Sequence, residues 1–204
     1  MDTQSPKIEV HAYVFLLMIL VSVSIGVAVA DPMYTMGGSA IKSESEKTEW
    51  LSTMSKRVES RIPDIDARME FLKVVLYESN RAELNPQLVL SLIDVASGFK
   101  KYAVSQGGAR GYMQVAPSWL KTIGAPDSNL FHLRTNIRYG CALLRYFIDF
   151  EKGDLMKALG RYRTQMGQVV GTGSAPVVED LEFPRKVDLR SKAHWGYEGS
   201  HSRE

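Results

Sequence analysis

The stretch from Asn85 to Gly98 constrains the fold most, because its start, interior and end all indicate one helix. Asn85 is a residue type that caps the first amides of a helix, and Pro86 suits the first helical position. Leu88 and Leu92 follow at helical spacing. Gly98 suits the left-handed backbone found just past a helix end. The pattern predicts a helix between these two caps.

Other parts of the chain carry helical patterns as well, and no pair of strands is indicated. These patterns cover residues 48–59, 64–80, a short stretch that opens at Pro117, 134–150, and a segment from Asp154 to about Tyr162. Runs of β-branched residues are few, and no internal repeat is present. The sequence therefore predicts an all-α, mainly helical fold.

The N-terminal segment is different, because residues 12–30 form a nearly continuous apolar series that ends in Ala28-Val29-Ala30. Small residues at that end are typical of a signal peptide cleavage site. The length is also close to the roughly 20 residues of a membrane span, so an uncleaved anchor stays open. Both interpretations of residues 1–30 predict that the rest of the chain is exported from the cytoplasm.

Length and composition leave room for one domain after this segment. The chain has 204 residues, of which 45% are apolar and 24% charged, as in ordinary globular proteins. Residues 31–47 are rich in Gly, Ser and charge and are predicted to form a linker. The domain is expected over residues 48–167, and residues 168–204 are expected to be a mostly disordered tail.

Several classes of partner and cofactor are not indicated. A net charge of +2 is too small to suggest a nucleic-acid partner. The four histidines show no paired metal-ligand spacing, so neither a metal nor another cofactor is expected. Cys141 is the single cysteine and cannot form an intramolecular disulfide, so we interpret it as a small buried residue.

The segment that begins at Val95 reads VASGFKKYAVSQGGARGYMQVAP. It resembles the soluble, goose-lysozyme-like lytic transglycosylases, whose segment runs Glu-Ser, Phe, Ala-x-Ser and then Gly-Ala-x-Gly-x-Met-Gln. The positions in register are Ser97, Phe99, Ala103, Ser105, Gly108, Ala109, Gly111, Met113 and Gln114. Further matches are Asn136, Ile137 and Gly140 in the family's Asn-Ile-x-x-Gly helix, and the cleft tyrosine at Tyr162.

The resemblance covers about Ile65 to Tyr162 and implies a lysozyme-like domain with a glycan groove. The implied partners are the glycan strands of peptidoglycan, and the implied location is the periplasm, with or without an inner-membrane anchor through residues 12–30. The family cleaves the MurNAc–GlcNAc bond without water and forms 1,6-anhydro-MurNAc. The residues expected to bind substrate are Ser97, Met113, Gln114 and Tyr162.

Ala96 stands where the resemblance places the family's catalytic glutamate. Glycosidic cleavage needs a proton donor, and losing one typically lowers the rate by about 10² to 10⁴. Asp94 is about 200° away around the helix, so it is not expected to substitute. Glu78 is interpreted as a helix-surface carboxylate. Glu83 precedes the helix, and the sequence leaves open whether it approaches the groove.

A second departure follows Tyr162, where the family usually has Asn and this chain has Arg163. The loop between Ala96 and Arg163 that carries Gly108, Gly111 and Gln114 is interpreted as part of the sugar-binding site. Gly108 and Gly111 let the backbone pass close to a sugar ring, and Gln114 can offer both a donor and an acceptor.

Three functions remain open on the sequence alone. The first is a peptidoglycan-binding, catalytically impaired member of the family. The second is an active transglycosylase, in which Ala96 is a substituted glutamate or Glu83 replaces it. The third is a membrane-tethered scaffold of an envelope assembly, which an uncleaved segment 12–30 would favour.

Overall fold

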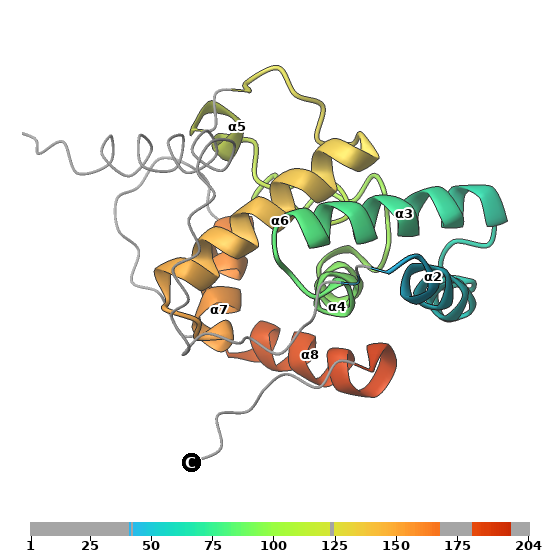
Figure 1. Ribbon diagram of the computed structural model, residues 1–204. Coiled ribbons are helices and arrows are strands. Elements are labelled where there is room, and N and C mark those ends of the chain that lie inside the picture. Colours follow the sequence, from blue (N-terminus) through green and yellow to red (C-terminus); the bar gives the residue numbers. More distant parts are fainter. Residues whose placement is uncertain (1–40, 42, 123–124, 168–180, 197–204) are drawn as a thin grey trace, which may run out of the picture.

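The computed structural model describes residues 41, 43–122, 125–167 and 181–196. The helices are α2 (Glu44–Val58), α3 (Ile65–Arg81), α4 (Pro86–Ser97), α5 (Ser118–Thr122), α6 (Leu133–Phe150), α7 (Leu155–Gly167), α8 (Glu182–Arg190) and the π-helical turn η1 (Ser191–Trp195) (Figure 1). Within the described ranges, extended pairing is limited to isolated bridges that join Arg110 to Val104 and Val115. The predicted all-α fold class is confirmed.

The predictions for residues 1–30 fall outside the described part of the chain. Among the helices that the structure describes, none has both the length and the apolar character required to cross a membrane.

Helix α4 lies at the centre of the fold, and both of its predicted caps are present. The Asn85 Oδ1 accepts hydrogen bonds from the backbone amides of Gln87 (2.8 Å) and Leu88 (3.4 Å). Gly98 has a φ of 58°, and its amide donates to the Asp94 carbonyl. Most of the helix is buried, because α3 packs on one side and α8 with η1 on another. These neighbouring helices therefore hold the C-terminal end of α4 in a fixed position.

The first helix begins earlier than its apolar pattern suggested. A capping box at Ser43 and Glu46 starts α2 at Glu44, inside the stretch 31–47 that was predicted to be a linker. That stretch is polar because its turn of helix is exposed. The buried side of α2 begins only at Trp50 and continues through Met54.

The predicted tail is wrong for residues 181–196, which form α8 and η1. Buried residues recur every fourth position at Phe183, Val187, Ser191 and Trp195, and this stripe packs against α4 and α7. Figure 1 shows α8 beside both helices. The stripe is narrow and its flanks are charged, so the mean composition of 168–204 concealed it. α7 is also longer than predicted and continues past Tyr162 to Gly167.

Glu78 is buried, which corrects its interpretation as a surface carboxylate. Its side chain is 1% exposed and is surrounded by three arginines, Arg81 (3.4 Å) from α3 and Arg134 (3.9 Å) and Arg138 (3.3 Å) from α6. The carboxylate therefore ties α3 to α6. Cys141 lies nearby in the core and is 1% exposed, as predicted, and burial followed by the Glu78 charge raises the pKa of its thiol.

Candidate functional site around Ala96

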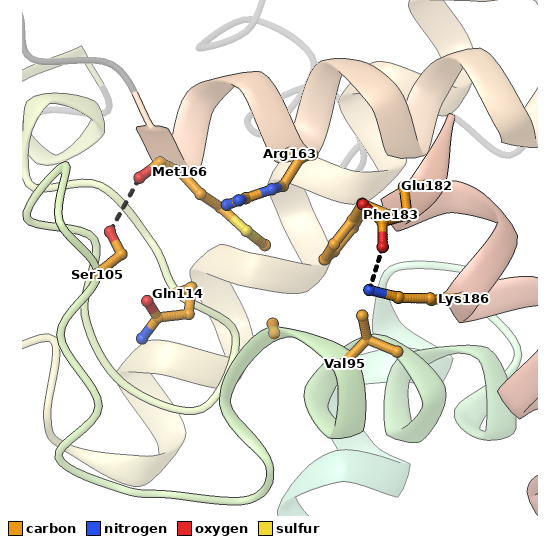
Figure 2. A pocket seen from close by; sticks show the side chains of 9 residues that line it. Val95, Ser105, Gln114, Arg163, Met166, Glu182, Phe183 and Lys186 are labelled. Carbon is orange, nitrogen blue, oxygen red and sulfur yellow. Dashed lines mark hydrogen bonds and ion pairs between the residues drawn. The ribbon is translucent and has the colours of Figure 1, made fainter. Parts of the chain in front are cut away.

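A cavity of about 230 Å³ opens at the C-terminal end of α4. We call it the Ala96 cavity. Its walls come from α4, the loop 98–117, α7 and α8, so segments far apart in the sequence meet there (Figure 2). The lining residues are Val95, Ala96, Ser105, Gln114, Arg163, Met166, Glu182, Phe183 and Lys186.

Gln114 is held in the wall by its amide nitrogen. The Nε2 donates to the carbonyls of Ala103 (3.1 Å) and Gly111 (2.9 Å), and the side chain is almost fully buried. Among the described residues, its carbonyl oxygen accepts no hydrogen bond. Gln114 can therefore accept a hydrogen bond from a ligand, but both of its N–H donors are already used within the protein. The sequence predicted that it could act both as a donor and as an acceptor.

The loop that carries Gln114 is anchored from α6 by Asn136, which is fully buried. The Asn136 Oδ1 accepts from the amide of Met113 (2.8 Å). Its Nδ2 donates to the carbonyls of Arg110 and Leu130, both at 2.8 Å. One side chain thus pairs with two buried backbone groups and with the part-buried Arg110 carbonyl, and it sets the position of the loop relative to the helices.

Three residues that were expected to bind substrate do not line the Ala96 cavity. Met113 is fully buried, and Tyr162 is 3% exposed and donates its hydroxyl to the Met113 carbonyl (2.8 Å). Burial raises the pKa of Tyr162 well above its ordinary value, so the hydroxyl stays protonated as a donor. Ser97 donates to the Ile93 carbonyl on its own helix (3.1 Å). In this structure Tyr162 therefore binds the loop residue next to Gln114, and Ser97 bonds within its own helix.

Other lining residues were not predicted as site residues. Ser105 belongs to the matched motif, and its hydroxyl donates to the Met166 carbonyl (3.0 Å), which joins the loop to α7 (Figure 2). Glu182, Phe183 and Lys186 come from α8, a helix that lies within the predicted disordered tail. The four-residue spacing from Phe183 onward was the signal that could have found them.

The carboxylates considered as substitutes at position 96 lie elsewhere. Asp94 is buried on another side of α4, where it pairs with Arg61 (3.3 Å) and Arg190 (3.7 Å). Glu83 is exposed before the start of α4, and Ala96 is about 15 Å further along the helix axis. Among the described residues, the carboxylate that lines the Ala96 cavity is that of Glu182, which is 72% exposed and pairs with Lys186.

The glycines of the loop have different surroundings. A Cβ on Gly111 would lie 2.4 Å from the Asn136 Nδ2 and 2.7 Å from the Leu130 carbonyl, and a Cβ on Gly108 would meet nothing within 4 Å. Gly111 is buried against protein. Its role is therefore internal packing, and the proposed approach to a sugar ring does not apply to it.

We expect Gly111→Ala to destabilise the fold by about 2–4 kcal/mol and Gly108→Ala by about 1–2 kcal/mol. Both residues have similar positive φ values, 79° and 82°, so the conformational cost of a Cβ is shared. The additional loss at Gly111 comes from the contact with backbone and with Asn136. Urea denaturation of both variants measures the difference. Equal losses would contradict the packing role.

Comparison with known proteins relates part of this chain to one family. Residues 73–173, about half of the chain, match the family model described as "Transglycosylase SLT domain". A solved structure, an inactive mutant of the lytic transglycosylase Slt from Pseudomonas aeruginosa, is 20% identical with a TM-score of 0.43. The alignment covers 74% of this chain and 26% of that one, so this chain spans about a quarter of the larger protein. The family match supports membership of residues 73–173 in the transglycosylase SLT domain family.

Proposed function

We propose that this chain binds peptidoglycan glycan strands through the Ala96 cavity and is impaired in cleaving them. The observation that carries the proposal is a cavity that joins Ala96 to the Gln114 acceptor within the segment matched to the SLT family. A carbonyl oxygen in that position can accept from a sugar hydroxyl or from the N–H of an acetamido group.

The chemistry at position 96 argues for binding over cleavage. By the register of the motif, this position belongs to the residue that would give a proton to the leaving oxygen and later take one back. A methyl group can do neither, so about 10² to 10⁴ of the rate is lost with it. Asp94 and Glu83 do not reach the cavity.

Glu182 favours a second candidate, an active transglycosylase whose acid comes from α8, because its carboxylate lines the same cavity. A carboxylic acid keeps its proton at neutral pH when it is buried among apolar groups. Glu182 is 72% exposed and pairs with Lys186, so that environment is absent. If this candidate is correct, sacculi incubated with the chain release anhydro-muropeptides, and Glu182→Gln abolishes that release.

The binding proposal is tested by co-sedimentation with purified sacculi. We expect Ala96→Phe to reduce the bound fraction to the background level, because the larger side chain fills the cavity. Ala67→Phe is the matched control, since Ala67 is exposed on α3 and should leave binding unchanged. Circular dichroism checks that both variants are folded. Equal binding by the two variants would place the glycan elsewhere on the molecule.

We further propose that the domain acts in the periplasm after export through residues 1–30. The apolar series 12–30 and its small C-terminal residues support this proposal. N-terminal sequencing of the exported protein distinguishes a cleaved signal peptide from an uncleaved membrane anchor. A start at Asp31 indicates a cleaved signal, and an intact N-terminus favours the tethered scaffold.

A further inference from the structure

The two positions that depart from the lytic transglycosylase pattern line the same cavity. Ala96 lies at the end of α4 and Arg163 lies on α7, 67 residues later, yet both belong to the Ala96 cavity. Compared with the family pattern, position 96 lacks a carboxylate, and position 163 carries a guanidinium group in place of an amide. Both differences make the cavity more positive.

Arg163 has no carboxylate within ion-pair distance among the described residues, whereas the neighbouring Lys186 is paired with Glu182. The Arg163 guanidinium carbon lies 5.8 Å from the ring centroid of Phe183, so the group rests against an aromatic wall. Figure 2 shows its side chain extending along the cavity beside Met166. Among the described residues, the lining holds the cations Arg163 and Lys186 and the anion Glu182, and Glu182 is the partner of Lys186.

We infer that the Ala96 cavity binds a sugar that carries a carboxylate, which pairs with Arg163 in the space that the small side chain of Ala96 leaves. A planar guanidinium can donate two parallel hydrogen bonds to a carboxylate. The Gln114 carbonyl oxygen, on another wall, accepts from a neutral N–H or hydroxyl of the same ligand. The pair of groups thus matches an N-acetylated sugar acid.

This inference rests on the proposed glycan binding and names the form of glycan that the site takes. The sugars of a peptidoglycan strand are N-acetylglucosamine and N-acetylmuramic acid, and only the second carries a lactyl ether with a carboxyl group. That carboxyl is an amide where a stem peptide is attached and a free carboxylate where the peptide has been removed. The ligand is therefore a glycan strand whose muramic acid is free of peptide.

The test compares two disaccharides that differ by the lactyl group, GlcNAc–MurNAc without peptide and GlcNAc–GlcNAc, titrated into the full chain by calorimetry. We expect the carboxylated disaccharide to bind about tenfold more tightly. Arg163→Gln should remove this preference and leave the weaker binding of the neutral disaccharide. Arg185→Gln should keep the preference, because it removes the same charge from an exposed position of α8 that does not line the cavity.

Each outcome separates this inference from the proposed function. Equal affinity for the two disaccharides, or an unchanged preference in Arg163→Gln, overturns the carboxylate site but leaves glycan binding standing. Binding to sacculi without binding to either disaccharide at millimolar concentration also overturns it. Failure of both disaccharides and of sacculi rejects the proposed function itself. Ala96→Glu gives an independent check, since a carboxylate introduced there should abolish the preference by repelling that of the ligand.

Discussion

The double variant Ala96→Glu/Arg163→Asn is expected to release 1,6-anhydro-muropeptides from sacculi about 10² to 10⁴ times faster than the wild-type chain. The single variant Ala96→Glu is expected to gain much less. The double variant places a carboxyl group at the proposed proton-donor position and removes the arginine that lines the same cavity. Mass spectrometry of the soluble products measures both rates.

The difference between the two variants has an electrostatic origin. A general acid must carry a proton at neutral pH, and a cation within about 4–6 Å of a carboxyl group favours its ionised form. In Ala96→Glu the new carboxyl group shares the cavity with Arg163, for which the described residues provide no other carboxylate. Arg163→Asn removes that cation and installs the residue that the family usually has after the tyrosine.

The matched control is Ala96→Gln/Arg163→Asn, which has nearly the same shape and no acid. It is expected to be inactive. Equal activity of the single and double glutamate variants would show that Arg163 does not oppose the acid. If the double variant is folded, binds sacculi and still releases nothing, then the two substitutions are not sufficient for cleavage.

Binding and cleavage thus make opposite demands on the charge of one cavity. A proton donor requires a carboxyl group at position 96 and no strong cation beside it. A receptor for a sugar carboxylate requires the reverse, a small side chain at position 96 and an unpaired guanidinium at position 163. The two departures from the family pattern were separate observations in the sequence, and the fold gives them one physical meaning because it places Ala96 and Arg163 around the same cavity.

The parts of the fold that the sequence predicts well are those decided by local chemistry. Asn85, Pro86 and Gly98 marked the ends of α4 because a cap depends only on neighbouring residues. The α8 helix was missed for the opposite reason. Its stability depends on burial of Phe183 and Trp195 against α4 and α7, and such contacts do not appear in the composition of a charged segment.

The site could be predicted only in part, because a sequence motif identifies residues but does not show whether their side chains face the cavity or the core. Ala96 and Gln114 reach the cavity, but Met113 and Tyr162 of the same pattern face each other in the core. Glu78 was misread in the same way, since the arginines that accompany it inside the fold lie partly on α6, more than 50 residues away. Long-range pairing of this kind leaves no periodic signal in a single sequence.

Asn136→Ala is expected to lower the free energy of unfolding by about 3–4 kcal/mol, because the buried Met113 amide and Leu130 carbonyl lose their partner and the Arg110 carbonyl loses one of its two hydrogen bonds. Asn129→Ala is the control, since its exposed side chain accepts one hydrogen bond from Phe131 and should cost about 1 kcal/mol or less. Urea denaturation measures both.

Because Asn136 also fixes the loop that carries Gln114, its variant should bind sacculi more weakly even at temperatures where it is folded. If the variant loses stability but binds sacculi fully, the loop keeps its position without Asn136. The hydrogen bonds from Gln114 to the carbonyls of Ala103 and Gly111 would then be sufficient to position the Gln114 carbonyl oxygen.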